Sequence, residues 1–383
     1  METSSEELVV AAALVAADTR NLLIQLKQYK LCKRCLTRHA EDHYAKAEAQ
    51  CYICRGLMGS LDLIVDKVIV AVKQYEFDTF VIGATLPTQI YEREDAMRAR
   101  LKIRGKESIK NQLTRELGLS LARITKRKTD YLKPDITINL VVDKENNVDV
   151  AVKSRPVVFA GRYIKKSRGI PQKQDRCPQC QGKGCMGCDR SGLSGYDSVE
   201  GIIAKGLMVK TKGETPRFSW IGSEDQNSLV LASGRPFSVR IYNPRKRDLG
   251  KTRVKGNGVT AKIMSMPGEI SELLPAHFIV KTRIHVKCEN AITKQDLKKL
   301  NSLAGANVNF EKRSKRAIKK IYSAYVRRLD SSSSEFMLTI VAEGGLMIKQ
   351  LVGGEEYMEP NISYLLNTKC QCVKFDILDV KIQ

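Results

Sequence analysis

The chain has 383 residues, enough for about two to four domains. Its 65 Lys and Arg outnumber 42 Asp and Glu, and the net charge of +23 excludes an acidic disordered protein and disfavours an ordinary small-metabolite enzyme. Hydrophobic residues make up 43% of the chain and 26 glycines are spread along it, as expected for folded domains with irregular connections. The composition predicts a globular protein that binds a polyanion, most simply a nucleic acid.

The first hydrophobic run, residues 8–17, is too short to span a bilayer. It follows Glu6 and Glu7, where a signal peptide would carry positive charge. An anionic membrane surface would also attract a basic protein, but the sequence has one Trp and no lysine-rich amphipathic segment with an aromatic face. We therefore expect a cytoplasmic protein without membrane attachment.

Eight of the eleven cysteines fall in four Cys-x-x-Cys pairs. In a chain without a secretion signal, paired cysteines indicate metal ligands before disulfides, because reducing compartments keep thiols free. The alternative is exposed or redox-active pairs, although no thioredoxin-like β-α-β pattern surrounds them. The pairs are Cys32 and Cys35, Cys51 and Cys54, Cys177 and Cys180, and Cys185 and Cys188.

The first two pairs are separated by fifteen residues, so that two tight turns would each offer two sulfurs to one metal ion. Four thiolates in this arrangement are typical of a tetrahedral structural zinc site. His39 and His43 lie between the pairs and are alternative ligands. We expect one zinc ion to be bound by Cys32, Cys35, Cys51 and Cys54.

Only four residues separate the two pairs of the second cluster, which is rich in glycine. We expect the four cysteines to bind a single zinc ion. The alternatives are that only some of them bind the metal or that they hold an iron–sulfur cluster. A closed four-sulfur set has no position for a substrate, so the role of either cluster would be structural. The other cysteines, expected to be core or surface thiols, are Cys288, Cys370 and Cys372.

The order of patterns along the chain predicts an α+β protein with several domains. Residues 1–30 are expected to form a helix, which together with the first cysteine cluster occupies residues 1–57. Residues 58–172 have apolar runs, a helix expected over 106–121 and a strand expected over 136–142, which predicts a small α/β unit. Residues 173–195 form the second cysteine cluster as a linker, and residues 196–383 are richer in strands.

Two strands of the C-terminal part are expected to have one apolar and one polar face. Residues 237–242 and 283–288 each alternate between apolar and polar side chains; in the second strand Arg283 is on the polar face and Ile284 on the apolar face. A half-buried sheet presents charge to a ligand in this way, although exposed lysines also discourage edge aggregation.

Three segments concentrate the positive charge. Residues 162–173 contain five Lys or Arg and no acid, residues 240–255 contain seven and one acid, and residues 311–329 contain eight and one acid. A solvated surface explains any one of them, but together they favour RNA or DNA binding. The first is expected to be a loop in which Gly161 allows close approach to a phosphate backbone. The expected nucleic-acid contacts are Arg162, Tyr163, Lys166, Arg168, Arg245, Lys246, Arg247, Lys312, Arg313 and Arg316.

Asp225 lies in a turn flanked by Gly222 and Gly234, ahead of an alternating strand. A carboxylate on such a loop can act as a nucleophile, because the loop exposes it while the sheet fixes its position. The alternative is an ordinary turn residue, since Asp is common in turns.

The stretch around Asp225 resembles a motif of the archaeal and eukaryotic THUMP-containing tRNA pseudouridine synthases, the Pus-ten family. The matching residues are Gly222, Glu224, Asp225, Leu231, Gly234, Arg235, Pro236 and Phe237. Residues 343–354, with the run Gly-Gly-Leu-Met-Ile-Lys-Gln-Leu-Val, are similar to a second segment of the family. Residues 161–172 and the glycine-rich cysteine linker are similar too, so the resemblance covers about residues 60–383.

The resemblance implies both a fold and an activity. It implies a THUMP-like RNA-binding domain at residues 58–172 and a pseudouridine synthase catalytic domain with a mixed antiparallel sheet at residues 196–383. Family members convert the T-loop uridines of tRNA, conventionally numbered 54 and 55, to pseudouridine without an organic cofactor. By residue-wise transfer, the nucleophile is Asp225. A carboxylate beside a flipped nucleotide suits this chemistry, and a base leaves a loop at lower cost than a duplex.

Three positions depart from the family pattern. The Arg that precedes Glu-Asp in the family is Ser223 here, the Tyr of its Lys-x-Tyr motif corresponds to Arg283, and the Tyr of its second segment is Met347. A guanidinium can stack on a base but does not replace a phenol, and Met only fills volume. The expected substrate pocket consists of Ser223, Arg235, Arg283, Met347 and Lys349.

These observations lead to one main hypothesis and two alternatives. The main hypothesis is a monomeric tRNA pseudouridine synthase with Asp225 as nucleophile. The first alternative is a catalytically weakened or inactive protein that binds or folds tRNA on the same scaffold. The second is a zinc-ribbon scaffold that recruits other proteins to RNA, which the four cysteine pairs alone support.

Overall fold

The computed structural model describes residues 20–40, 50–265, 277–312, 315–329, 334–354 and 357–382. Two compact units, Met1–Arg155 and Pro156–Gln383, make up the chain. The helix expected over residues 1–30 lies partly outside the described residues; within them, residues 20–27 are helical. Within the described ranges, no helix combines the length and the apolar character needed to cross a membrane.

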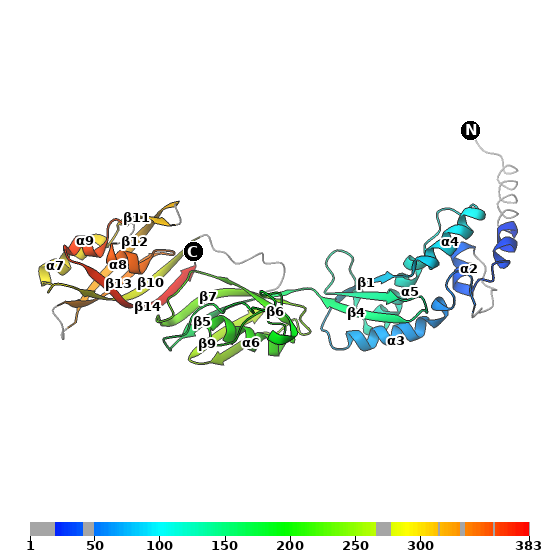
Figure 1. The fold of residues 1–383 in the computed structure, drawn as a ribbon, viewed down its shortest axis with the longest axis horizontal. Coiled ribbons are helices and arrows are strands. Elements are labelled where there is room, and N and C mark those ends of the chain that lie inside the picture. The colour runs from blue at the N-terminus through cyan, green and yellow to red at the C-terminus, as the bar shows by residue number, and fades with distance from the viewer. Residues whose placement is uncertain are drawn as a thin grey trace, which may run out of the picture. The chain divides into compact units, whose positions relative to one another are not determined.

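The first unit contains a four-stranded sheet with helices packed against it (Figure 1). The strand order is β2-β1-β3-β4, in which β1 pairs in parallel with β2 and β3, and β3 pairs antiparallel with β4. Its named elements are α2 (Lys33–His39), the 3-10 turn η1 (Leu57–Ser60), α3 (Leu61–Val72), β1 (Thr79–Thr85), α4 (Thr88–Arg100), α5 (Ile109–Thr125), β2 (Lys128–Thr129), β3 (Ile136–Val142) and β4 (Val148–Ser154).

Local sequence explains the main elements of this unit. The strand expected over residues 136–142 is β3, with the same bounds. Helix α5 buries Ile109, Leu113 and Leu117, which are four residues apart and therefore share one face. It begins later than expected because Ser108 caps it: the side chain of Ser108 accepts a hydrogen bond from the main-chain N–H of Asn111.

The second unit is built around one ten-stranded mixed sheet with the order β11-β12-β13-β10-β14-β7-β5-β9-β8, and β6 also pairs with β7. Its strands are β5 (Val157–Lys165), β6 (Glu214–Trp220), β7 (Val230–Tyr242), β8 (Lys251–Gly256), β9 (Val259–Ser265), β10 (Phe278–Cys288), β11 (Asn307–Lys312), β12 (Lys315–Arg328), β13 (Glu335–Glu343) and β14 (Cys370–Ile382). Its helices and 3-10 turns are η2 (Met186–Cys188), α6 (Val199–Thr211), α7 (Lys294–Lys299), η3 (Leu300–Leu303), α8 (Ile348–Gly353) and α9 (Ile362–Leu366).

The ten-stranded sheet has two halves with separate cores. Most of its pairs are antiparallel, but β14 and β7 pair in parallel at Ile377 and Val230, and this seam joins the halves. On one side of the seam, α6 covers a core that includes the ring of Trp220 stacked on Phe218, with centroids 5.0 Å apart. On the other side, α8 and α9 pack near β10, β13 and β14. The expected α+β class, with a mixed and largely antiparallel sheet in the C-terminal part, is confirmed.

One expectation about local structure is wrong: residues 157–165 form the strand β5, whereas the basic, glycine-containing sequence predicts a loop from residue 161 onward. Gly161 is required for the packing of strands and not for contact with phosphate. A Cβ at this position would lie 2.6 Å from the main-chain oxygen of Lys262 on β9 and 2.9 Å from the ring of Phe237 on β7. Strand β5 lies between β7 and β9, so Tyr163 and Lys165 are carried into the interior.

Candidate active site and metal centres

The four cysteines of the first unit form one cluster. All four are buried, and their Sγ atoms lie within 4.8 Å of one another. The Sγ atoms of Cys32 and Cys54 are 3.7 Å apart. Four sulfurs at about 2.3 Å from a tetrahedral zinc ion lie about 3.8 Å from one another, so the cluster fits such an ion. Its members are Cys32, Cys35, Cys51 and Cys54.

Both ring nitrogens of His39, the alternative metal ligand, have hydrogen-bond partners outside the set of sulfur atoms. Its Nδ1 lies 2.7 Å from the main-chain oxygen of Cys35, and its Nε2 accepts a hydrogen bond from Arg98 at 3.0 Å. Burial lowers the pKa of His39 to about 4, so the ring is neutral at pH 7. His43 lies outside the described residues. The donor set of this cluster is therefore made of sulfur alone among the residues described.

The second cluster is more exposed. The Sγ atoms of its four cysteines also lie within 4.8 Å of one another, and three of the four residues are partly exposed. Cys180 and Cys188 have their Sγ atoms 3.8 Å apart, which again fits tetrahedral zinc. The members are Cys177, Cys180, Cys185 and Cys188.

This cluster is tied to the strand that leads to Asp225. Arg190 of its loop forms an ion pair of 2.6 Å with Glu214 at the start of β6. Arg217 of β6 donates a hydrogen bond to the main-chain oxygen of Gly182, between the two cysteine pairs. The cluster therefore supports β6, and the remaining cysteines belong to no such set in the described ranges; Cys288 and Cys370 are buried partners across β10 and β14.

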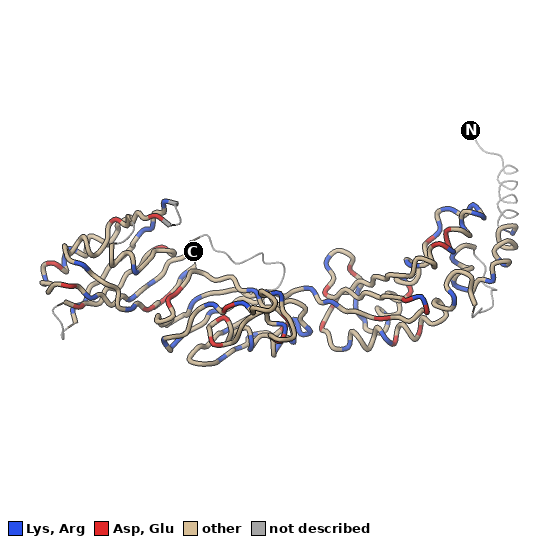
Figure 2. The backbone as a smooth tube through the Cα atoms, in the orientation of Figure 1, with Lys and Arg blue, Asp and Glu red and all other residues tan. Residues whose placement is uncertain are grey.

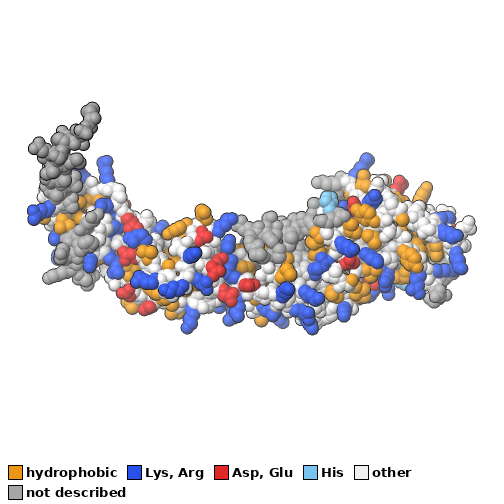
Figure 3. All heavy atoms as spheres, turned by 180° about the vertical axis from the view of Figure 1, so that it is seen from behind, with side chains coloured by type: hydrophobic (Ala, Val, Ile, Leu, Met, Phe, Trp, Pro, Cys, Tyr) orange, Lys and Arg blue, Asp and Glu red, His pale blue; other side chains and the backbone are white. Residues whose placement is uncertain are grey.

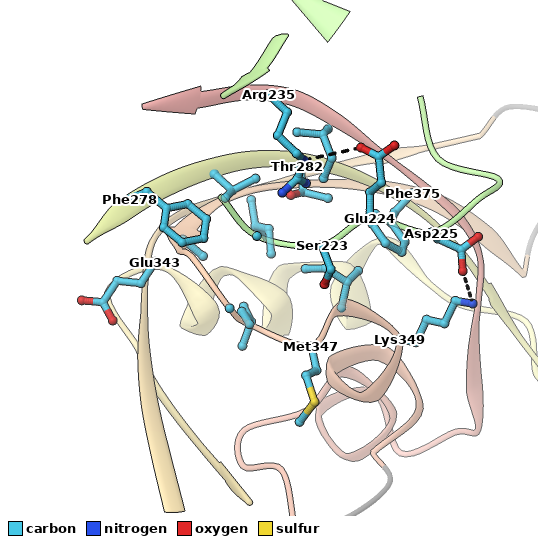
Figure 4. A pocket seen from close by; sticks show the side chains of 18 of the residues that line it. Ser223, Glu224, Asp225, Arg235, Phe278, Thr282, Glu343, Met347, Lys349 and Phe375 are labelled. Atoms are coloured by element: carbon cyan, nitrogen blue, oxygen red, sulfur yellow. Dashed lines mark hydrogen bonds and ion pairs between the residues drawn. The ribbon is translucent and has the colours of Figure 1, made fainter. Parts of the chain in front are cut away.

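A cavity of ≈ 370 Å³ lies beside the loop that joins β6 to β7 (Figure 4). Its volume is in the range of about 300–1,000 Å³ that is usual for small-molecule sites. The loop, strands β10, β13 and β14, and the start of α8 contribute its walls. The lining residues used below are Gly222, Ser223, Glu224, Asp225, Arg235, Phe278, Thr282, Met347, Lys349 and Phe375.

Asp225 and Lys349 form an ion pair in this cavity. Nζ of Lys349, in the first turn of α8, donates to Oδ2 of Asp225 at 2.6 Å, and the main-chain N–H of Asn227 donates to Oδ1 at 2.9 Å. The hydrogen bond from Lys349 is the main reason that the pKa of Asp225 is lowered, and the same bond raises the pKa of Lys349. The side chain of Asp225 is 26% exposed. An ionised, accessible carboxylate in a cavity can act as a nucleophile.

Glu224, the neighbour of Asp225, has a fully buried side chain. Its Oε2 accepts a hydrogen bond from the hydroxyl of Tyr163 at 2.8 Å. The same oxygen lies 3.4 Å from Nε of Arg235 (Figure 4). Its Oε1 lies 2.9 Å from Nζ of Lys165. Burial, followed by the charge of Glu224, raises the pKa of Tyr163 well above its usual value, so the phenol remains a donor. A buried network of charges therefore lies directly beneath the loop.

Two further buried side chains hold the start of the same loop. Nη1 of Arg235 donates to the main-chain oxygen of Ile221 at 2.8 Å, and Nε2 of Gln172 donates to that of Gly222 at 3.4 Å. Gly222 has φ +74°, and a Cβ there would lie 2.5 Å from Nη1 of Arg235. A left-handed conformation and a close approach both require glycine at this point.

The structure brings four of the five expected pocket residues to the cavity. Ser223, Arg235, Met347 and Lys349 line it, and of these Arg235 is only 1% exposed. Arg283 does not line it, which corrects the expectation: it is exposed on the other face of β10, and Thr282 is on the cavity face. The reason is the alternation of side chains along a strand.

Sequence reasoning missed several residues of the site. Thr282, Phe278 and Phe375 line the cavity, and Lys165 lies beneath the loop. The alternation that places Arg283 with the polar residues of β10 already assigns Thr282 to the opposite face. Lys165 gave no such signal, because it is one cation in a basic segment.

Three of the residues expected to contact nucleic acid are buried or bonded to other groups within the second unit. Tyr163 is fully buried. Arg162 donates to the main-chain oxygens of Ser233 and Gly234, each at 2.9 Å. Arg168 forms an ion pair of 2.7 Å with Asp376 of β14. These side chains bind groups of β7, β14 and the loop between β6 and β7, so the expectation that they contact nucleic acid is not supported by their positions.

The other expected contacts are more accessible. Lys166, Lys246 and Arg316 are exposed, and Arg245 and Arg247 are partly exposed. The side chain of Lys312 is not described, and Arg313 lies outside the described residues. Lys and Arg residues occur along the backbone of both units (Figure 2), and their side chains are spread over the face shown in Figure 3. Ample positive surface is therefore available for a polyanion.

Two family models match the chain. Residues 158–381 match the model described as "Pus10, C-terminal", and residues 64–141 match the model described as "Pus10 THUMP domain, archaeal". The first match includes the whole cavity and the second includes most of the first sheet.

Curated relatives named "tRNA pseudouridine synthase Pus10" are similar over most of the chain. The protein of Nitrosopumilus maritimus is 35% identical over 376 residues, which cover 94% of this chain and 96% of the relative. That of Cenarchaeum symbiosum is 32% identical over 340 residues, which cover 88% and 82%. A solved "Cbf5-Nop10-Gar1 Complex" aligns with a TM-score of 0.30 and 9% identity over 57% of each chain, a likeness too weak to support further statements.

Proposed function

Because this chain belongs to the Pus10 family of tRNA pseudouridine synthases, we propose that it isomerises uridine in the T loop of tRNA with Asp225 as the nucleophile. Family membership makes the chain an isomerase. The T-loop target and the role of Asp225 are our proposal. The observation that supports it most is the ion pair of Asp225 with Lys349 in a cavity that the loop and the sheet enclose.

The chemistry requires few groups. The bond between N1 of the base and C1′ of the ribose breaks, a bond between C5 and C1′ forms, and the C5 proton is lost while N1 gains one. The product has the same atoms as the substrate, so no organic cofactor is needed. An ionised Asp225 can provide the nucleophile for cleavage, and the cavity can receive the flipped base. Lys349 keeps the carboxylate ionised and fixes one of its oxygens.

Binding of tRNA is assigned to exposed cations of both units. The phosphate backbone of tRNA attracts a chain with a net charge of +23. In the second unit we assign Lys166, Lys246 and Arg316 to phosphate contacts, because their side chains are exposed. We further propose that the protein acts as a monomer in the cytoplasm.

We assign a structural zinc ion to each cysteine cluster. The sulfur positions fit tetrahedral coordination in both sets. Four thiolates leave no open position, so neither ion would take part in the reaction. The ion of the second cluster would stabilise the loop that Arg190 and Arg217 connect to β6.

A single-turnover assay tests the proposal. Wild-type protein in excess over an unmodified tRNA transcript should form pseudouridine in the T loop, detected by chemical mapping at nucleotide resolution. Asp225→Asn keeps the size of the side chain and should form none, while its affinity for tRNA stays within about twofold. Asp248→Asn, at an exposed carboxylate that bonds to Gly250 and Ser265, is the matched control and should react as wild type does.

Two results would contradict the proposal. Product formation by Asp225→Asn at the wild-type rate would exclude Asp225 as nucleophile. Tight tRNA binding without product from the wild-type protein would instead favour a protein that binds or folds tRNA on this scaffold.

A further inference from the structure

Lys165 has a fully buried amino group beneath the loop of Asp225. It is the last residue of β5, its side chain is 0% exposed, and its Nζ lies 2.9 Å from Oε1 of Glu224. The same nitrogen donates to the main-chain oxygens of Ile170 at 2.9 Å, Gln226 at 3.2 Å and Asp225 at 3.3 Å. Its three hydrogen bonds thus go to main-chain oxygens, and the contact with Glu224 is an ion pair.

We propose that Lys165 is a positioning residue for Asp225, which holds the main chain of the nucleophile in place and supplies a buried positive charge beneath its carboxylate. The proposal rests on the assignment of Asp225 as nucleophile. Lys165 does not reach the reacting atoms, because its contacts are the main chain of the loop and the side chain of Glu224.

The main chain of the loop shows why such a residue is needed. Residues 221–229 connect β6 to β7 without forming a helix or strand, so hydrogen bonds from side chains help to hold them in position. Arg235 and Gln172 hold the oxygens of Ile221 and Gly222, at the start of the loop. Lys165 holds the oxygens of Asp225 and Gln226, at the nucleophile itself.

The strand that carries Lys165 also fixes Glu224. Tyr163 and Lys165 are two residues apart on β5 and therefore share a face. The hydroxyl of Tyr163 donates to Oε2 of Glu224, and Lys165 lies at Oε1, so both oxygens of the carboxylate have a partner from one strand. Because Glu224 precedes Asp225, fixing its side chain also restricts the direction in which Asp225 can point.

The balance of charge favours an ionised nucleophile. Lys165 and Arg235 face one carboxylate, Glu224, so the buried cluster has a net positive charge. Lys349 from α8 also faces Asp225, as does the thiol of Cys372 on β14. The hydrogen bond from Lys349 lowers the pKa of Asp225 most, and the charge of Lys165 acts in the same direction. Lys165 thus contributes both geometry and charge.

Two variants separate these contributions. Lys165→Met keeps a long side chain without charge, but it leaves the buried Glu224 without its cation and can impair folding. Lys165→Met combined with Glu224→Gln removes both members of the pair, so the cluster retains one net positive charge from Arg235. Folding of each variant is checked by far-UV circular dichroism and by the fluorescence of the single Trp, Trp220, which lies in the same core.

The double variant should bind an unmodified tRNA transcript with the wild-type affinity, but its single-turnover rate constant at saturating protein should fall by about ten- to a hundredfold, since a hydrogen bond to a charged group is lost at the nucleophile. Lys165→Met alone should show the same loss and also a shift of the acid limb of the pH–rate profile to higher pH. Lys205→Met, at an exposed lysine of α6, is the control and should behave as wild type.

A folded double variant with the wild-type rate would overturn the proposal, and so would a loss confined to tRNA affinity. Asp225→Asn, measured in parallel, distinguishes the two assignments. If Asp225→Asn is inactive while the double variant is fully active, Asp225 is retained as the nucleophile and the role proposed for Lys165 is wrong. If Asp225→Asn is active, the nucleophile itself is wrong.

Discussion

The ring of Phe278 occupies the space that a side chain at Gly344 would need. A Cβ at Gly344 would lie 2.2 Å from Cε2 and from Cζ of Phe278, far inside van der Waals contact. The main-chain N–H of Gly344 also donates to the oxygen of Phe278 at 2.7 Å. Because Phe278 lines the cavity, the absence of a side chain at position 344 determines where this wall lies.

Gly344→Ala should therefore damage the cavity. The methyl group forces the ring of Phe278 to move, at a cost of about 1–3 kcal/mol in unfolding free energy. We expect kcat/KM for tRNA to fall about tenfold or more, because a misplaced wall disturbs the orientation of the base. Adding Phe278→Ala should restore the stability but not the activity. Gly118→Ala, at a helical glycine with no atom within 4 Å of an added Cβ, should leave kcat/KM unchanged.

Lys349→Met should make the reaction more sensitive to acid. Its hydrogen bond is the main cause of the lowered pKa of Asp225, so removing it raises that pKa. The acid limb of the single-turnover pH–rate profile should move to higher pH, and the rate at pH 7 should fall by about tenfold or more. In the wild type, the stabilisation from the pair is present above the unfolded pKa of Asp and is lost as pH falls through the lowered pKa. An unchanged acid limb would contradict this account.

The two cysteine clusters should differ in how readily they lose zinc. Three cysteines of the second cluster are partly exposed, whereas all four of the first are buried. Purified protein should contain two zinc ions per chain, and a chelator should remove them in two phases, the faster from the second cluster. Cys185→Ser should abolish the fast phase and Cys51→Ser the slow one. Each variant should have a lower melting temperature than wild type. Metal analysis that finds one ion or none would refute the assignment.

Glu94→Gln should destabilise the first unit. Its side chain is 2% exposed, and Oε1 lies 2.6 Å from Nη2 of Arg38, which is also buried. Removing the negative charge leaves the buried Arg38 without its carboxylate partner, at a cost of about 3–5 kcal/mol. Glu107→Gln, in a more exposed pair with Arg115, should cost less than about 1 kcal/mol.

Spectroscopy separates the two units in this experiment. The single Trp, Trp220, lies in the second unit, so its fluorescence follows that unit alone. For Glu94→Gln, urea unfolding followed by circular dichroism should show an early transition that the fluorescence does not detect. Coincident shifts of both signals would show that the two units unfold together.

Exposed cations should set the salt dependence of tRNA binding. Lys246→Gln and Arg316→Gln should each weaken binding, and each should reduce the slope of log Kd against log salt concentration by about 1, as expected for one lost phosphate contact. Arg168→Gln should instead lower stability, because Arg168 is paired with Asp376. Equal slopes for all variants would remove Lys246 and Arg316 from the interface.

Periodic and spaced features could be predicted from the sequence. Strand β3 and the α5 helix follow from their apolar spacing, and the two cysteine sets follow from the Cys-x-x-Cys spacing. The motif around Asp225 and its flanking glycines likewise indicate this residue. Each of these signals is local in the chain, so neighbouring residues suffice to detect it.

Features that depend on distant partners could not be predicted. Residues 161–165 are basic and include a glycine, which is typical of a loop, yet they form a central strand because β7 and β9 enclose them. Burial of Lys165 depends on Glu224, which is 59 residues further along the chain. For Arg283, by contrast, the local pattern is sufficient. Its alternation with Ile284 places it on the polar face of β10, away from the cavity, whereas the resemblance to the family motif predicts a pocket residue.

The seam between β14 and β7 determines when the cavity can form during synthesis of the chain. Phe375 and Ile377 of β14 line the cavity, and Ile377 is paired with Val230 at the seam. Among the described strands, β14 is the last along the chain. Before β14 leaves the ribosome, the emerging chain has neither this wall nor the connection between the two halves of the sheet. The cavity is therefore completed only after β14 has been synthesised.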